Sequence, residues 1–231
     1  IINGTKNWVT NGKYSDYVLV FAITEKGVGH KGISCFLVEK SFDGFEVGKP
    51  EDKLGIRSSD TTELYFDNVC VPKTHLIGKE GEGFKIALST LDGGRIGIAA
   101  QALGIAQSAL DNSISYSKER QQFGKPIAMN QSIQNKLADM AIEIESARLL
   151  TRKAAWLKDS KLDFGYAASM AKVYASEVAM RASTECVQIH GGYGYIKETG
   201  VERLMRDAKI TQIYEGTSEI QRLVIARHLL K

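Results

Sequence analysis

The pattern of apolar residues changes at about Pro72, and this change constrains the fold more than any other feature of the chain. Before it, short runs rich in β-branched and aromatic residues alternate with turn residues, which is typical of strands. After it, apolar residues recur at helical spacing to the end of the chain. We therefore expect an α+β protein, with part of a β-barrel or sandwich domain over residues 1–76 and a helical-bundle domain over residues 77–231.

Five segments of the first part are candidate strands. They are residues 8–12, 17–24, 32–39, 44–48 and 62–71. Asn11-Gly12 and Asp43-Gly44 are turn pairs. Short strands with glycine-rich links favour a barrel or sandwich over a parallel sheet.

Three long helices are expected in the second part. They begin near Phe84, Ser132 and Gly165, and two shorter ones cover residues 199–208 and 218–230. The third long helix carries a stripe of small residues, which allows close helix packing. Gly93-Gly94 lies inside the first, where each glycine costs about 1 kcal/mol relative to alanine. Such a pair requires a packing or binding reason.

Composition excludes several classes of protein. The 231 residues carry a net charge of only +3, from 30 basic and 27 acidic side chains, so no strong field favours nucleic acid or an anionic membrane. No apolar run approaches the roughly 18 to 20 residues of a membrane span. The three cysteines and four histidines are scattered, which indicates neither disulfides nor a metal site and fits a reducing compartment.

Four motifs each allow a purely structural interpretation. "LDGGR" (91–95) could be a helix with Asp92 and Arg95 paired on its surface. "ERQQFGKPI" (119–127) could only end a helix after Phe123, although Arg120 there is also suited to clamp a phosphate. "QIHGGYGY" (188–195) could cap a helix, although its glycines would also admit a cofactor closely. "WVTNG" (8–12) could be a strand leading to a hairpin turn.

A fifth motif, "IYEGTSEIQR" (213–222), begins the last helix. Ser218 and Gln221 have the spacing of a capping box, and Glu219 in the first turn complements the helix dipole. Capping explains neither Glu215 nor Gly216.

Together, in this order, the motifs resemble the acyl-CoA dehydrogenase family, most nearly its short-chain (butyryl-CoA) group. The match covers essentially all 231 residues, and it also includes "EDKLGIRSS", "RDAKITQ" and "IARHLL". The resemblance implies a middle β domain, a C-terminal four-helix-bundle domain, FAD as cofactor and a homotetramer. It also implies that this chain starts partway through the β domain, without the family's N-terminal helical domain and an earlier flavin-binding segment.

The resemblance assigns Glu215 as the catalytic base. In the family reaction the base removes the α-proton of an acyl-CoA while the β-carbon gives a hydride to flavin N5, which leaves a trans-2-enoyl thioester. Donors to the thioester oxygen, the backbone N–H of this glutamate and a ribityl hydroxyl, make the α-proton acidic enough. An apolar pocket should raise the pKa of the glutamate. Relatives with long or branched substrates place the base at the position of Gly94, which cannot act as one.

The resemblance also assigns the binding residues. Substrate-binding residues are Asp92, Gly93, Gly94, Arg95 and Gly216, where a side chain at the last would crowd the thioester. Cofactor-binding residues are Trp8, Val9, Thr10, Arg120, Gln131, Gln188, Ile189, His190, Gly191, Gly192, Thr217, Ser218 and Glu219, some of them toward the FAD of a neighbouring subunit. His190 departs from the aliphatic or aromatic residue that the family often has there, and we expect it to be tolerated.

The resemblance further implies that electrons pass to electron-transferring flavoprotein in fatty acid β-oxidation. The compartment is the cytoplasm in a bacterium and the mitochondrial matrix in a eukaryote. Two alternatives remain open at this point. One is an acyl-CoA oxidase, which hands electrons to oxygen, and the other is a flavin-free, non-catalytic helical oligomerisation fragment.

Overall fold

The computed structural model describes all 231 residues, and its contacts divide the chain into two compact units, Ile1–Thr90 and Leu91–Lys231. The division falls within the first long helix. The domain boundary after residue 76 stays a prediction.

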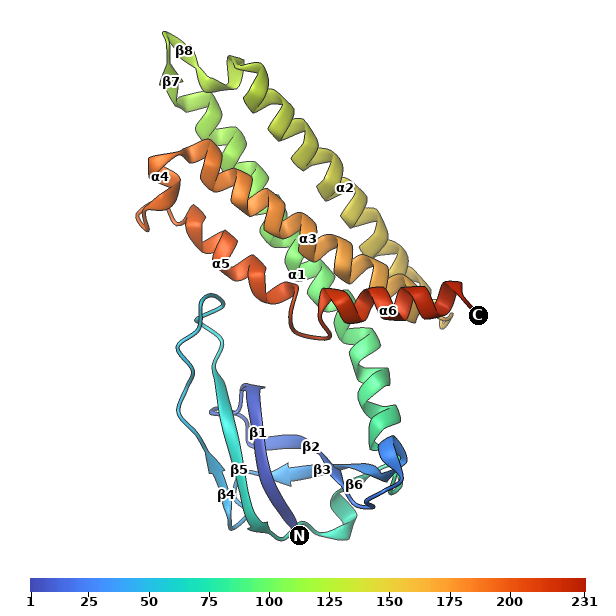
Figure 1. Cartoon of the computed structure of the whole chain (residues 1–231). Helices are drawn as coiled ribbons and strands as arrows, with labels where there is room; N and C mark the ends of the chain where they lie inside the picture. Colours follow the sequence, from blue (N-terminus) through green and yellow to red (C-terminus); the bar gives the residue numbers. More distant parts are fainter. The chain divides into compact units, whose positions relative to one another are not determined.

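The first unit contains two small antiparallel sheets (Figure 1). One has the order β1-β5-β4 and the other β2-β3-β6. The strands are β1 (Ile2–Thr10), β2 (Tyr17–Ile23), β3 (Ile33–Glu39), β4 (Phe45–Val47), β5 (Thr61–Val69) and β6 (Leu76–Ile77). Short 3-10 turns, η1 (Gly29–Gly32) and η2 (Lys73–His75), precede β3 and β6.

The two sheets share one apolar core, as in a sandwich. On β5, Thr62, Leu64 and Phe66 alternate inward. Leu64 and Phe66 form one apolar cluster with Val20 of β2 and Val38 of β3 from the other sheet, and each of these side chains is at most 5% exposed. The predicted β-sandwich architecture is thus confirmed.

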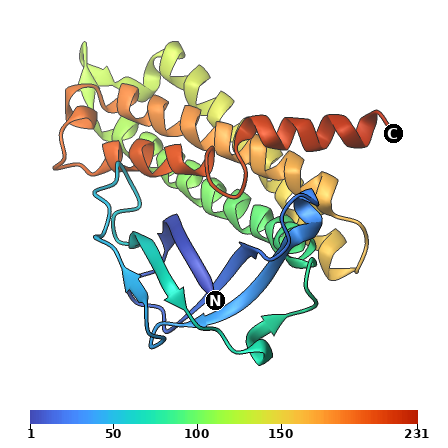
Figure 2. The same ribbon diagram turned by 60° about the horizontal axis from the view of Figure 1, so that its bottom comes forward.

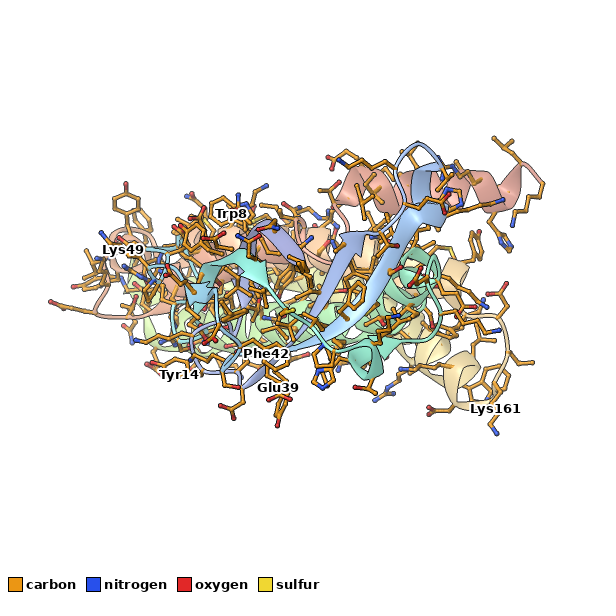
Figure 3. The ribbon with its side chains drawn as sticks, turned by 90° about the horizontal axis from the view of Figure 1, so that it is seen from below. Trp8, Tyr14, Glu39, Phe42, Lys49 and Lys161 are labelled. Carbon is orange, nitrogen blue, oxygen red and sulfur yellow. The ribbon has the colours of Figure 1, made fainter.

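Contacts of His75 hold η2 against the end of β3. Its Nδ1 lies 3.0 Å from the carbonyl oxygen of Leu37, and its ring lies 5.6 Å from that of Phe42. Glu39, labelled with Phe42 in Figure 3, approaches His75 Nε2 at 3.8 Å.

The hairpin interpretation of "WVTNG" is wrong, because β1 and β2 belong to different sheets. Asn11 does turn the chain, at φ 62°. Its N–H donates to the carbonyl oxygen of Asp60 (3.2 Å), and the N–H of Lys13 donates to Asp60 Oδ2 (2.8 Å). The turn is therefore tied to the segment before β5, and the chain crosses to the second sheet.

The second unit is a helical bundle. Its elements are α1 (Gly83–Glu119, which begins in the first unit), β7 (Gln121–Gln122), β8 (Lys125–Pro126), η3 (Ile127–Met129), α2 (Gln131–Asp159), α3 (Gly165–His190), α4 (Gly192–Tyr195), α5 (Val201–Thr211) and α6 (Ser218–Leu229). All five predicted helices form within a few residues of the expected bounds. None of the helices is both long and apolar enough to cross a membrane.

Helices α1, α2, α3 and α5 contribute to a single core, which confirms the four-helix bundle. Figures 1 and 2 show the long helices α1, α2 and α3 running side by side. Ala102 and Ala106 of α1 and Ala171 and Ala175 of α3 are fully buried in this core, and the small side chains of α3 let it pack closely against α2. α3 lies innermost and also contacts α5 and α6.

Helix α1 ends at Glu119, four residues before the predicted stop at Phe123. The next residues form the β7–β8 hairpin, and Phe123 and Gly124 both have positive φ at its tip (54° and 76°). Two-residue turns of this hand match the twist of paired strands. At the opposite end of α2, Lys161 (Figure 3) turns the chain toward α3 with φ 57°.

Candidate active site

The loop between α5 and α6 holds Glu215 in a left-handed backbone conformation. Glu215 has φ 54° and Gly216 has φ 90°. This region costs a residue with a side chain about 1–2 kcal/mol, and such strain clusters at functional sites. Gly216 must be glycine for its φ and also because a Cβ there would lie 2.6 Å from Nε2 of Gln221.

The predicted capping box is wrong in its residues. Thr217 is the N-cap of α6, and its hydroxyl accepts from the N–H of Ile220 at 3.4 Å. Ser218 is the first helical residue, and its buried Oγ has no partner. The Nε2 of Gln221 instead donates to the carbonyl oxygens of Glu215 (3.2 Å) and Gly216 (3.0 Å). The partly buried carbonyl groups of this loop need donors, and Gln221 supplies them.

A fully buried lysine of α3 supplies the other donor to this loop. Lys172 has no exposed surface, and its Nζ donates to the carbonyl oxygen of Gly216 at 2.7 Å. Tyr214, which directly precedes Glu215, donates a hydrogen bond from its hydroxyl to Oε1 of Gln101 on α1. The loop is thus held from α1, α3 and α6.

The carboxylate of Glu215 lies directly against Gly94 of α1. A Cβ at position 94 would lie 2.5 Å from Oε2 and 3.0 Å from Cδ of Glu215. Any larger residue would push the carboxylate away. This contact explains why position 94 is glycine, whereas a Cβ at Gly93 would instead lie 3.1 Å from Nζ of Lys158.

Burial raises the pKa of Glu215, although the positive charges of Arg95 and Lys172 oppose the shift. Burial also lowers the pKa of Lys172 to about 8, with the neighbouring guanidinium of Arg95 adding to the effect. The carboxylates of Glu215 and Glu219 act in the opposite direction on Lys172. A half-buried carboxylate with a raised pKa in a polar cluster is a candidate general base.

Arg95 is buried, so the surface-pair interpretation of "LDGGR" is wrong. Arg95 is 4% exposed. Its Nη1 donates to Oδ1 of Asp92 (2.6 Å) and to Oγ of Ser169 on α3 (3.3 Å). The i,i+3 pair does form within α1, and the bond from Arg95 to Ser169 joins α1 to α3. Arg95 Nε has no partner.

A hollow of about 450 Å³ lies at the C-terminal end of α3. It brings together five of the predicted cofactor residues: Arg120, Ile189, His190, Gly191 and Gly192. Gln131 and Gln188 are exposed and do not line it.

In this hollow, Arg120 and His190 each pack against an aromatic ring. The guanidinium of Arg120 lies 5.7 Å from the ring centre of Tyr193. The ring of His190 stacks on Tyr116 at 4.2 Å, and its Nδ1 lies 2.8 Å from the carbonyl oxygen of Cys186. The histidine therefore fits this position by stacking as an aromatic residue would.

A smaller hollow of about 190 Å³ lies at the start of α6. Thr217, Ser218 and Glu219 line it together with the basic residues Lys209 and Arg222. Glu177, which pairs with Arg222 at 2.6 Å, also lines it, so the N-terminus of α6 and Lys209 are the features that suit an anionic group.

The remaining predicted residues, Trp8, Val9 and Thr10, lie on β1 of the first unit. A register shift between Lys6 and Val9 puts Trp8 at φ 59°, where its side chain is 71% exposed (labelled in Figure 3). Bulges of this kind redirect a side chain and are common next to functional sites.

Sequence reasoning missed Lys172 and the role of Gln221. One signal was available, because helical spacing places Lys172 on the small-residue stripe of α3, between Ala168 and Ala175. A lysine on an apolar stripe is rare unless it has a buried partner.

Two family models match this chain, one in its first part and one in its second. Residues 81–230 match the family model of the acyl-CoA dehydrogenase C-terminal domain, and residues 1–69 match the model of the middle domain. All of the chain is 56% identical to a mitochondrial short-chain specific acyl-CoA dehydrogenase of Bos taurus, 56% of whose length it covers.

Two solved structures are equally similar. Butyryl-CoA dehydrogenase from Megasphaera elsdenii superimposes with a TM-score of 0.98 at 55% identity, over 99% of this chain and 60% of that one. A chain in the structure of the electron transferring flavoprotein of Acidaminococcus fermentans gives the same TM-score and identity, over 100% of this chain and 61% of that one. The chain thus spans about 60% of the length of these relatives.

Proposed function

Because this chain belongs to the acyl-CoA dehydrogenase family, we propose that its full-length protein dehydrogenates a short-chain acyl-CoA to the trans-2-enoyl-CoA. Glu215 is the base that takes the α-proton, and FAD is the hydride acceptor. The observation that carries the assignment is the half-buried carboxylate of Glu215, set on a left-handed turn against Gly94. Identity of 55–56% to short-chain and butyryl-CoA dehydrogenases supports the substrate class.

The chemistry requires a base of raised pKa and a polarised thioester. Burial raises the pKa of Glu215, which strengthens it as a base for a carbon acid. The backbone N–H of Glu215 donates to no other group of the chain. It is therefore available to the thioester oxygen, where a preorganised donor stabilises the developing enolate.

The residues predicted to bind substrate shape the surroundings of the base. Gly94 leaves room for the carboxylate, since a Cβ there would lie 2.5 Å from its Oε2, and Gly216 allows the left-handed turn that carries it. Together with Gly93 they are the proposed glycine contacts to the substrate. Asp92 and Arg95 anchor this part of α1 to α3. These contacts hold the segment of α1 that carries Gly94, against which the carboxylate lies.

The chain's residues fit FAD at two places. The hollow beside Arg120 has a guanidinium for phosphate, aromatic and aliphatic walls, and Gly192, where a Cβ would meet nothing within 4 Å. The hollow at α6 has a helix N-terminus and the unpartnered Oγ of Ser218. When bound, FAD supplies the acceptor for the β-hydride. Trp8, Val9 and Thr10, together with Gln131 and Gln188, complete the proposed contact set.

Electron-transferring flavoprotein is the proposed electron acceptor, in fatty acid β-oxidation. The similarity to a chain in an electron transferring flavoprotein structure supports it. A eukaryotic protein of this kind would act in the mitochondrial matrix, as the name of the Bos taurus relative suggests, and a bacterial one in the cytoplasm.

A homotetramer is the proposed assembly. On α2, Ile142, Leu149 and Trp156 recur every seven residues and are 65%, 59% and 61% exposed. Seven residues are two helical turns, so the three side chains form one apolar stripe that needs a partner.

Anaerobic bleaching of the bound flavin by butyryl-CoA tests the function. In the full-length protein, Glu215→Gln should keep FAD and bind butyryl-CoA, yet lose flavin reduction by about 10²- to 10⁴-fold. Glu145→Gln is the matched control, because Glu145 pairs with Arg148 on the surface of α2. Normal bleaching by the Glu215 variant would reject the assignment, and steady peroxide release without another acceptor would favour an oxidase. A colourless, well-folded full-length protein would favour the oligomerisation fragment.

A further inference from the structure

Lys172 is the one lysine of the chain that is fully buried, and the proton abstraction described above does not use it. It has no exposed surface and belongs to none of the chain's ion pairs. Its one hydrogen bond goes to a backbone carbonyl, that of Gly216, at 2.7 Å. Burying a lysine without a paired carboxylate is costly. A specific role at its single partner would explain why the site keeps it.

That partner is the residue directly after Glu215. The carbonyl oxygen of Gly216 accepts from Lys172 Nζ and from Gln221 Nε2, while Gln221 also donates to the carbonyl oxygen of Glu215. The two donors come from α3 and α6, so they fix both peptide groups of the left-handed turn from two directions. The turn's backbone then sets the direction of the Glu215 side chain toward Gly94.

We infer that Lys172 is a positioning residue for the reaction, which holds the Glu215–Gly216 turn by its bond to the Gly216 carbonyl and places a positive charge beside the base. Gln221 shares the first task but not the second, because its amide is uncharged. This inference rests on the proposed role of Glu215. Two contributions can then be measured separately: Lys172 supplies both a hydrogen bond to the turn and a positive charge, whereas Gln221 supplies hydrogen bonds alone.

The charges around the site give the inference a pH signature. Arg95 of α1 and Lys172 both lower the pKa of Glu215 against the effect of burial, while Glu215 and Glu219 of α6 favour the charged form of Lys172. Removing the Lys172 charge should therefore raise the pKa of Glu215 further. Since the base must be deprotonated, the acid limb of kcat should move to higher pH.

Four variants of the full-length flavoprotein test this. Lys172→Met removes both the donor and the charge, Lys172→Arg keeps the charge, and Gln221→Met removes only the uncharged donor. Lys26→Met, at an exposed lysine between β2 and η1 of the first unit, is the matched control. The readouts are FAD content, KM for butyryl-CoA, and kcat as a function of pH.

For Lys172→Met we expect kcat to fall about 10- to 100-fold, as a misplaced reacting group does, with little change in KM. Its acid limb should rise by about one pH unit. Lys172→Arg should restore the limb to its original pH. Gln221→Met should lower kcat without moving the limb.

Two results would overturn the inference: a Lys172→Met enzyme whose kcat and acid limb match those of Lys26→Met, or one in which only KM changes. If Lys172→Met does not fold, Gln221→Met decides. Unchanged turnover in that variant would mean that hydrogen bonds to the Glu215–Gly216 turn do not position the base, and it would reject the inference. Failure of the proposed function is recognised separately, because Glu215→Gln would then retain turnover.

Discussion

Replacing Gly94 by alanine should separate folding stability from catalysis, because the added methyl group has opposite effects on the two. In a helix interior, alanine is favoured over glycine by about 1 kcal/mol, which corresponds to roughly 2–4 °C in Tm for a protein of this size. Against this, the new Cβ would lie 2.5 Å from Oε2 of Glu215, whereas ordinary contact begins at 3.4 Å. The carboxylate must retreat by about 0.9 Å.

Folding should tolerate this movement, because the atoms that yield are the end of a flexible side chain. The reaction should not, since a displacement of about 1 Å in a reacting group can cost about 100-fold in rate. We expect the full-length Gly94→Ala protein to have a kcat about 100-fold lower and a Tm equal to or above that of the unmodified protein.

Steady-state turnover of butyryl-CoA and thermal melting, measured on the same preparations, check this expectation. Gly97→Ala is the matched control, because Gly97 lies on the same helix and a Cβ there meets nothing within 4 Å. It should gain stability and keep its activity. If Gly94→Ala turns over as fast as Gly97→Ala, the carboxylate does not act from its position against α1.

The same structure makes three further predictions. The pKa of Glu215 is raised in the folded protein, so the native state binds the proton more tightly and stability falls as pH rises through that range; Glu215→Gln should unfold at higher temperature than the unmodified protein at pH 7, with the melting curves converging at acidic pH. Asp92→Ala removes the carboxylate paired with the guanidinium of Arg95, a residue only 4% exposed, and leaves it the bond to Ser169; it should lower the free energy of unfolding by about 3 kcal/mol in denaturant titrations. His190→Phe keeps the stack on Tyr116 but loses the bond to the carbonyl one turn earlier, so it should cost about 1 kcal/mol by the same assay and retain FAD.

Much of the fold could be predicted because periodicity reports burial directly. The alternation of Thr62, Leu64 and Phe66 indicates a half-buried strand, and the alanine stripe of α3 indicates a packed helix. Strand pairing could not be predicted in this way. Asn11-Gly12 has the local chemistry of a hairpin, but the partner of Asn11, Asp60, lies far along the chain.

The site could be predicted only in part, for the same physical reason. Glu215 and Gly216 stand out in the sequence, since capping leaves them unexplained. The contacts that give them an environment join residues far apart in the sequence: Gly94 to Glu215, and Lys172 to Gly216. The capping rule also assigned the wrong partner to Gln221. It considers only the free N–H groups at the start of α6, whereas Gln221 donates to the partly buried carbonyl groups of the preceding loop.

Exchange of the α-hydrogen of butyryl-CoA with water tests the central claim most directly, because it reports removal of the proton itself. The full-length flavoprotein would be incubated anaerobically with α-deuterated butyryl-CoA, and loss of deuterium would be followed by NMR. The unmodified protein and Glu145→Gln should release deuterium, whereas Glu215→Gln should do so at least about 10²-fold more slowly. Equal rates of release in all three proteins would contradict the assignment of Glu215 as the base.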